Sequence, residues 1–405
     1  MGLGYEIPNI FKNGTDPVSG GLFSFPHFQT GAVDNAVSSS INIKWLENLG
    51  LEMPTNPDEL YNVLKAFKEQ DADGDGDPNN EIPWIASGDI TPVEFLLPAF
   101  GYNMQGWWDA WVVSQDEKSI EFFPASERYK EALAFITKCY EEGLLYKDTF
   151  SIGCEQIRAM GQTGEALGMF GEWHPGATVG YWDKTKTADE NLVDDYVALV
   201  PFEGAKWPTS GGLNRGGIAI TDKCEHPEIM VAWADLMYSY EGALVANYGI
   251  EGDTYDIVDG AIKMRDKENP STTWGENVDH ARIQMGGGVF APITTYVEGI
   301  EPYYNLEEDP TCRLSLDIYE QFEELDKFYK AWPALALNEA EGEQNADIMA
   351  DVDAYRLSYR AEVITGKKVL EDSWDEYIAT LNAMGLETAV ANMNAAYARY
   401  LGNAE

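Results

Sequence analysis

Residues 56–81, NPDELYNVLKAFKEQDADGDGDPNNE, join a helix start, a helix and an acidic loop in direct succession. Pro57 follows Asn56 at a first-turn position, and Glu59 stands three residues after Asn56, an arrangement typical of a capping box. The apolar residues that follow recur at helical spacing and predict one amphipathic helix that ends near Gln70. They are Leu60, Val63, Leu64 and Phe67.

The loop after this helix predicts a calcium site. Aspartates occupy alternate positions from Asp71 to Asp77, and Gly76 at the sixth position allows the bend of an EF-hand loop. The closing Glu81 stands at position eleven instead of twelve, and Ile82-Pro83 replaces a second helix. A solvated acidic turn is the alternative, but aspartates this close repel one another unless a cation neutralises them. We expect a structural calcium ion held by Asp71, Asp73, Asp75, Asp77, Asn80 and Glu81.

Further periodic segments predict an α/β fold. Helices are expected from about Ser126 to Gly143, from Pro227, and from Ser373, which forms a second capping box with Glu376. The helix at Pro227 should bury Ile229, Ala232, Trp233, Leu236 and Tyr240. Short apolar runs predict strands at 22–25, 166–170, 196–201 and 216–220. The acidic Gly/Glu stretch 338–345 is expected to be a solvated connection.

Length and charge restrict the class of protein. The 405 residues suffice for two or three folding units, and the net charge of −42 repels phosphate backbones and anionic lipid, so no nucleic-acid or membrane-surface partner is expected. No apolar run is long enough to span a bilayer, and MGLGYEIPNIF lacks the features of a signal peptide. HExxH, GxSxG and nucleotide-binding motifs are also absent from the sequence, which argues against the enzymes that carry them.

Tryptophans in polar, glycine-rich stretches suggest a sugar cleft. Trp107 and Trp111 lie in GWWDAW, Trp173 in FGEWHPG, and Trp274 in STTWGEN. Sugar rings stack their C–H faces on aromatic rings while carboxylates and arginine bind the hydroxyls. Any one of these tryptophans is as readily explained by core packing. A paired-carboxylate glycosidase stays open, because with 69 acidic residues many pairs could meet at the required separation.

Several stretches together resemble bacterial extracellular solute-binding proteins, the sugar receptors of ABC importers, in the maltose-binding-protein-like group. The resemblance is to its oligosaccharide branch, which includes alginate-binding proteins and carries a calcium loop. It rests on 41–84, on GMFGEW at 168–173, on 216–260 (GGIAITDKCEHPEIM onward) and on the tail from VITGKK at 363. Family members place about a hundred residues before the strand LFSFP, which begins here at Leu22. The resemblance therefore implies a start that is absent or replaced, and the first lobe would lack its leading strand if it is absent.

The resemblance implies a non-enzymatic receptor with a two-lobe, type II periplasmic-binding-protein fold. Residues 1–26 and 213–290 would form the first lobe, and 27–212 with 291–405 the second, which carries the calcium loop 71–81. An oligosaccharide would lie between the lobes and be delivered to the permease subunits of an importer, with the receptor acting as a monomer at the cell surface or in the periplasm. The implied sugar contacts are Glu172, Trp173, Trp207 and Trp274, followed by Trp107, Trp182, Arg215 and Tyr296. The alternative is a secreted polysaccharide-degrading enzyme or its accessory carbohydrate-binding module.

Overall fold

The computed structural model describes most of the chain. The described residues are 19–21, 23, 25–28, 39–87, 96–100, 110–114, 116, 118–171, 175–180, 187, 190–205, 207–208, 213–237, 239, 241–242, 244–245, 249–253, 255–258, 261–264, 328–329 and 335–402. Within these ranges, no helix combines the length and the hydrophobicity that crossing a membrane requires.

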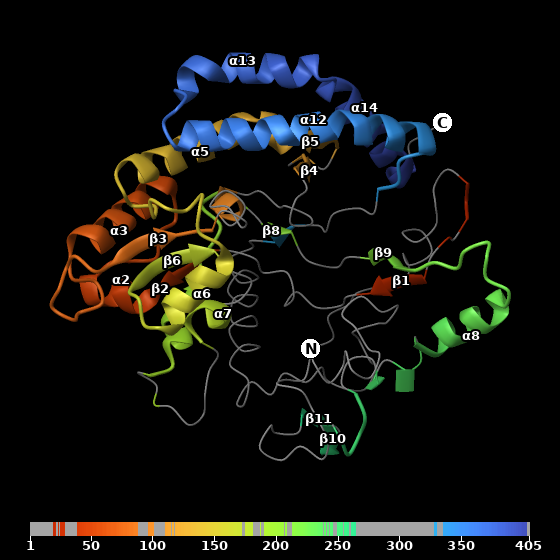
Figure 1. The fold of residues 1–405 in the computed structure, drawn as a ribbon, viewed down its shortest axis with the longest axis horizontal. Coiled ribbons are helices and arrows are strands. Elements are labelled where there is room, and N and C mark those ends of the chain that lie inside the picture. Colours follow the sequence, from red (N-terminus) through yellow and green to blue (C-terminus); the bar gives the residue numbers. More distant parts are fainter. Residues whose placement is uncertain are drawn as a thin grey trace.

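A mixed four-stranded sheet organises the half of the molecule that contains the acidic loop (Figure 1). Its strand order is β3-β6-β2-β7; β3 and β6 are parallel, and β2 is antiparallel to both of its neighbours. The strands are β2 (Ser39–Asn42), β3 (Ile82–Ile85), β6 (Leu167–Gly171) and β7 (Tyr196–Ala198). The predicted strands at 166–170 and 196–201 are thus present, whereas β2 and β3 were not expected from the sequence.

Helices α2 (Ile43–Leu49) and α3 (Pro57–Glu69) precede the acidic loop and pack beside this sheet. The side chain of Asn56 accepts a hydrogen bond of 2.9 Å from the Glu59 N–H and so begins α3 as predicted. The four predicted apolar residues of α3 are all buried. Phe67, at the end of that face, meets the Trp45 ring of α2 edge-on at 5.1 Å between centroids. The predicted helix, its start and its buried face are confirmed. The reciprocal half of the capping box is not, because the Glu59 side chain accepts from the N–H and the hydroxyl of Thr55, both at 2.8 Å.

Three C-terminal helices extend the same core: the first two pack on α5 (Glu127–Glu141), and the third packs on the first two (Figure 1). They are α12 (Glu339–Ile364), α13 (Leu370–Ala383) and α14 (Leu386–Leu401). One apolar cluster contains buried residues both from 41–202 and from 352–397. At its centre, the Tyr359 and Tyr377 rings stack 4.1 Å apart, and the Tyr377 hydroxyl donates to the Pro124 carbonyl oxygen at 3.1 Å.

The remaining elements of this half connect these layers. They are η3 (Leu97–Phe100), β4 (Trp111–Val113), β5 (Ile120–Phe122), η4 (Phe123–Ala125), α6 (Cys154–Gln162), α7 (Pro175–Val179) and η6 (Leu192–Asp195). Trp111 is 6% exposed on β4, so this tryptophan of GWWDAW is a core residue.

Two predictions for the C-terminal part are wrong. Residues 338–345 are not a solvated connection: Asn338 caps α12, and Glu341 completes a reciprocal capping box with it. Ser373 does not begin a helix, because α13 starts three residues earlier and the Ser373 hydroxyl donates to the Val369 carbonyl oxygen at 2.7 Å. In both cases the local polar residues are compatible with more than one structure, and the packing of neighbouring segments decides which structure forms.

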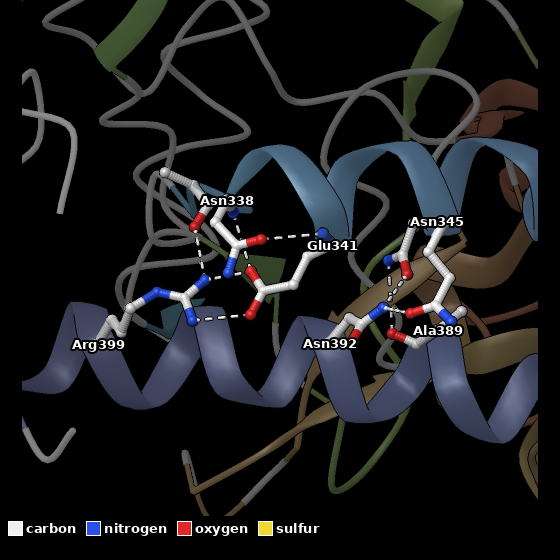
Figure 2. Close-up of polar contacts among 8 residues, drawn as sticks. Asn338, Glu341, Asn345, Ala389, Asn392 and Arg399 are labelled. Atoms are coloured by element: carbon white, nitrogen blue, oxygen red, sulfur yellow. Dashed lines mark hydrogen bonds and ion pairs between the residues drawn. The ribbon is translucent and has the colours of Figure 1, made fainter. Parts of the chain in front are cut away.

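A polar seam joins α12 to α14 and explains why the acidic start of α12 is helical (Figure 2). Arg399 donates to both oxygens of Glu341, at 2.5 and 2.9 Å, and to the Ala336 carbonyl oxygen at 3.1 Å. The Glu341 side chain is 14% exposed and that of Arg399 18%. One turn further along, Asn392 donates to the side-chain oxygen of Asn345, and Asn345 donates to the Ala389 carbonyl oxygen.

Glu341 should make stability depend on pH. The Arg399 guanidinium, and secondarily the Asn338 N–H, lower the pKa of Glu341 below its ordinary value of 4.5. A carboxyl whose pKa is lower in the folded state stabilises it fully above pH 4.5, and this contribution is lost as the pH falls through the folded-state pKa. Glu341→Gln should therefore cost about 1.5–3 kcal/mol at pH 7 and progressively less below pH 4.5, as measured by urea unfolding. The exposed Glu339→Gln is the control; an equal loss in both variants would contradict the prediction.

The other half contains shorter described elements (Figure 1). β1 (Phe25–Phe28) pairs antiparallel with β9 (Leu213–Ile218), and β10 (Tyr255–Val258) pairs antiparallel with β11 (Ala261–Met264). β8 (Trp207–Pro208) pairs in parallel with β12 (Phe328–Tyr329). The predicted strands at 22–25 and 216–220 are thus displaced by a few residues, to β1 and β9.

Helix α8 (Pro227–Met237) begins where predicted, but the prediction of its buried face is wrong. Ile229, Trp233 and Leu236 are 60%, 43% and 57% exposed, and Ala234 is buried in their place. The helix makes no extensive contact with another described helix or strand. Amphipathic spacing predicts which face is apolar, but only packing partners can bury it.

Candidate functional site

The acidic loop connects the end of α3 to the start of β3 and turns through two left-handed glycines. Gly74 and Gly76 have φ angles of +79° and +97°, a region that residues with a side chain rarely occupy. The backbone N–H of Gly76 donates to both carboxylate oxygens of Asp71, at 3.2 and 3.1 Å. The tight turn therefore folds the middle of the loop back over its first residue.

This turn brings three of the predicted ligands together. Carboxylate oxygens of Asp71, Asp73 and Asp75 all lie within 4.8 Å of one another. Desolvation, and then the charges of Asp75 and Asp71, raise the pKa of Asp73. The ionised cluster is thus electrostatically unfavourable by itself, and a divalent cation at its centre would relieve the repulsion.

Glu81 approaches the cluster from the other end of the loop. Its Oε1 accepts a hydrogen bond of 2.9 Å from the N–H of Ala72, which lies between Asp71 and Asp73. Its Oε2 is buried and has no hydrogen-bond partner. A buried carboxylate oxygen without a partner is costly. The three clustered aspartates and this unpartnered oxygen at the other end of the loop fit a metal site, as predicted from the spacing.

The other two predicted ligands make contacts within the loop. Asp77 Oδ1 accepts from the backbone and side-chain nitrogens of Asn79, at 3.2 and 2.9 Å, and the Asn80 side chain donates to Asp75 Oδ2 at 2.7 Å. Asn80 thus orients Asp75, and direct coordination by Asp77 and Asn80 stays a prediction. Asn48 of α2 also anchors the loop, through a hydrogen bond of 3.0 Å to the Ala72 carbonyl oxygen. Sequence reasoning missed Asn48, because it precedes Ala72 by 24 residues and belongs to no local pattern.

The sugar-binding predictions lie mostly outside the described residues. This holds for Trp107, Glu172, Trp173, Trp182, Trp274 and Tyr296. Trp207 belongs to strand β8, and Arg215 belongs to strand β9. Strand β6, at the centre of the four-stranded sheet, ends at Gly171, directly before Glu172 and Trp173. The contact of these two residues with sugar stays a prediction.

Comparison with curated proteins identifies related sequences, although no family model matches the chain. The chain is 27% identical over 401 residues to the fructooligosaccharide ABC transporter substrate-binding protein FusA of Streptococcus pneumoniae serotype 4. This alignment covers 95% of this chain and 70% of FusA. It is 28% identical over 240 residues to the lipoprotein LipO of Bacillus subtilis, covering 57% of this chain and 46% of LipO. These relatives confirm the predicted resemblance to the solute-binding proteins of ABC transporters.

Solved structures confirm the two-lobe α/β fold. An HMO binding, ABC-transporter associated solute-binding protein of Bifidobacterium longum infantis has a TM-score of 0.76 at 20% identity, and the match covers 98% of this chain and 80% of that one. An EF-hand mutant of FusA in complex with fructo-nystose has a TM-score of 0.72 at 22% identity, with the same coverage. The alginate-binding protein AlgQ2 without calcium ion has a TM-score of 0.70 at 21% identity, covering 96% and 77%. The last two names connect this fold with an EF-hand and with calcium.

Proposed function

We propose that this chain, a relative of the substrate-binding proteins of ABC transporters, is an extracellular receptor that binds an oligosaccharide and passes it unchanged to an importer. The observation that supports this most directly is the alignment of 95% of the chain with a fructooligosaccharide-binding member of that group. The permease subunits of the importer would be its protein partners at the cell surface or in the periplasm, and the receptor would act as a monomer. The proposed lobes are 1–26 with 213–290 and 27–212 with 291–405.

Binding would proceed by closure of two lobes around the sugar. The chain runs through β8 before it enters the segment 213–264, and through β12 before it returns to the C-terminal helices, so the two segments lie side by side where they pair. A short parallel ladder can hold both segments in register while the parts that they connect rotate. The sugar favours the closed state only to the extent that it contacts both lobes.

The proposed sugar contacts combine flat rings with charged or polar groups. Trp173, Trp207 and Trp274 would stack on sugar rings, and Glu172 would bind hydroxyls; Trp107, Trp182, Arg215 and Tyr296 would extend the site. The net charge of −42 favours a neutral sugar over a polyanionic one such as alginate.

A panel of neutral and acidic oligosaccharides tests this proposal by thermal unfolding in the presence of calcium. A ligand at a hundred times its dissociation constant should stabilise the protein by about 2.7 kcal/mol and raise the midpoint by a few degrees. Trp173→Ala should abolish the shift, and Trp233→Ala, at an exposed position on α8, should keep it. The sugar recovered afterwards should have its original mass. Cleaved sugar would instead favour the degrading enzyme, and a shift that survives Trp173→Ala would contradict the proposed stacking site.

We propose calcium as the resident ion of the acidic loop, with a structural role. Asp71, Asp73, Asp75 and Glu81 would hold it, and the ion would supply the positive charge that the cluster lacks. Through Ala72 and Asn48 the occupied loop would connect α2, the end of α3 and the start of β3.

Removal of the ion should lower stability measurably. Because the ion binds the folded loop and not the unfolded chain, chelation should lower the thermal midpoint by a few degrees, corresponding to about 2.7 kcal/mol if the free ion stood at a hundred times its dissociation constant. Differential scanning fluorimetry with and without chelator measures this shift. Asp73→Asn should have the lower midpoint already and should not respond to chelator; a response equal to that of the unchanged protein would contradict the site.

A further inference from the structure

We draw no further inference here: the strongest candidate, the apolar face of helix α8 on which Ile229, Trp233 and Leu236 are exposed, carries no proposal, because nothing in the structure shows what covers it.

Discussion

Trp84→Ala is expected to destabilise the acidic-loop half by about 3–5 kcal/mol, the largest effect of a single side chain that we predict. Trp84 is 1% exposed on β3, three residues after Glu81, and its ring lies 6.5 Å from that of Phe135 on α5. Its carbonyl oxygen accepts from the Tyr146 N–H at 2.8 Å, a contact that the substitution leaves in place. The loss is therefore one of buried ring surface and of the cavity that remains.

Trp233→Ala is the matched control, because it removes the same side chain from a site that is 43% exposed. Its effect should be about 1 kcal/mol or less. Urea unfolding followed by far-ultraviolet circular dichroism measures both variants. Equal losses in the two variants would mean that the described packing does not determine stability.

Gly168→Ala is expected to have the second largest effect, about 3 kcal/mol of destabilisation, although it adds only one methyl group. Gly168 lies in β6 between β3 and β2, and a Cβ atom there would stand 2.7 Å from the Pro83 carbonyl oxygen and 2.7 and 2.8 Å from ring atoms of Phe67 and Trp45. The Pro83 oxygen belongs to the backbone of the neighbouring strand and cannot rotate away. Both the β3–β6 pairing and the two rings must therefore adjust.

Gly342→Ala provides a control of opposite sign. Gly342 lies in α12, where a Cβ would meet nothing within 4 Å. Alanine is there the better helix former, so the substitution should stabilise the protein by about 0.5–1 kcal/mol. Thermal unfolding of both variants and of the unchanged protein measures these two effects. Destabilisation by Gly342→Ala, or none by Gly168→Ala, would contradict the described packing.

Local rules predicted the parts of this molecule whose causes lie within a few residues. Asn56 caps α3, Ser126 caps α5, and the apolar spacing of α3 identifies its buried face. The turn of the acidic loop belongs to the same class, because it is formed by alternate aspartates and two glycines through hydrogen bonds within the loop. The resemblance to solute-binding proteins, confirmed by the relatives, rests on stretches of this local kind.

The sequence by itself therefore determined the caps of α3 and α5, the acidic turn and the family likeness, since each depends on contacts between residues that are neighbours along the chain. The tertiary structure alone decided the rest. Residues 338–345 are helical because Arg399, 58 residues after Glu341, neutralises that carboxylate. The α8 face is exposed because no described element packs extensively against it. Glu81 has one oxygen free because Ala72, nine residues earlier, holds the other. Spacing along a chain specifies which groups can interact, but burial and the choice of partner depend on segments that meet only after folding.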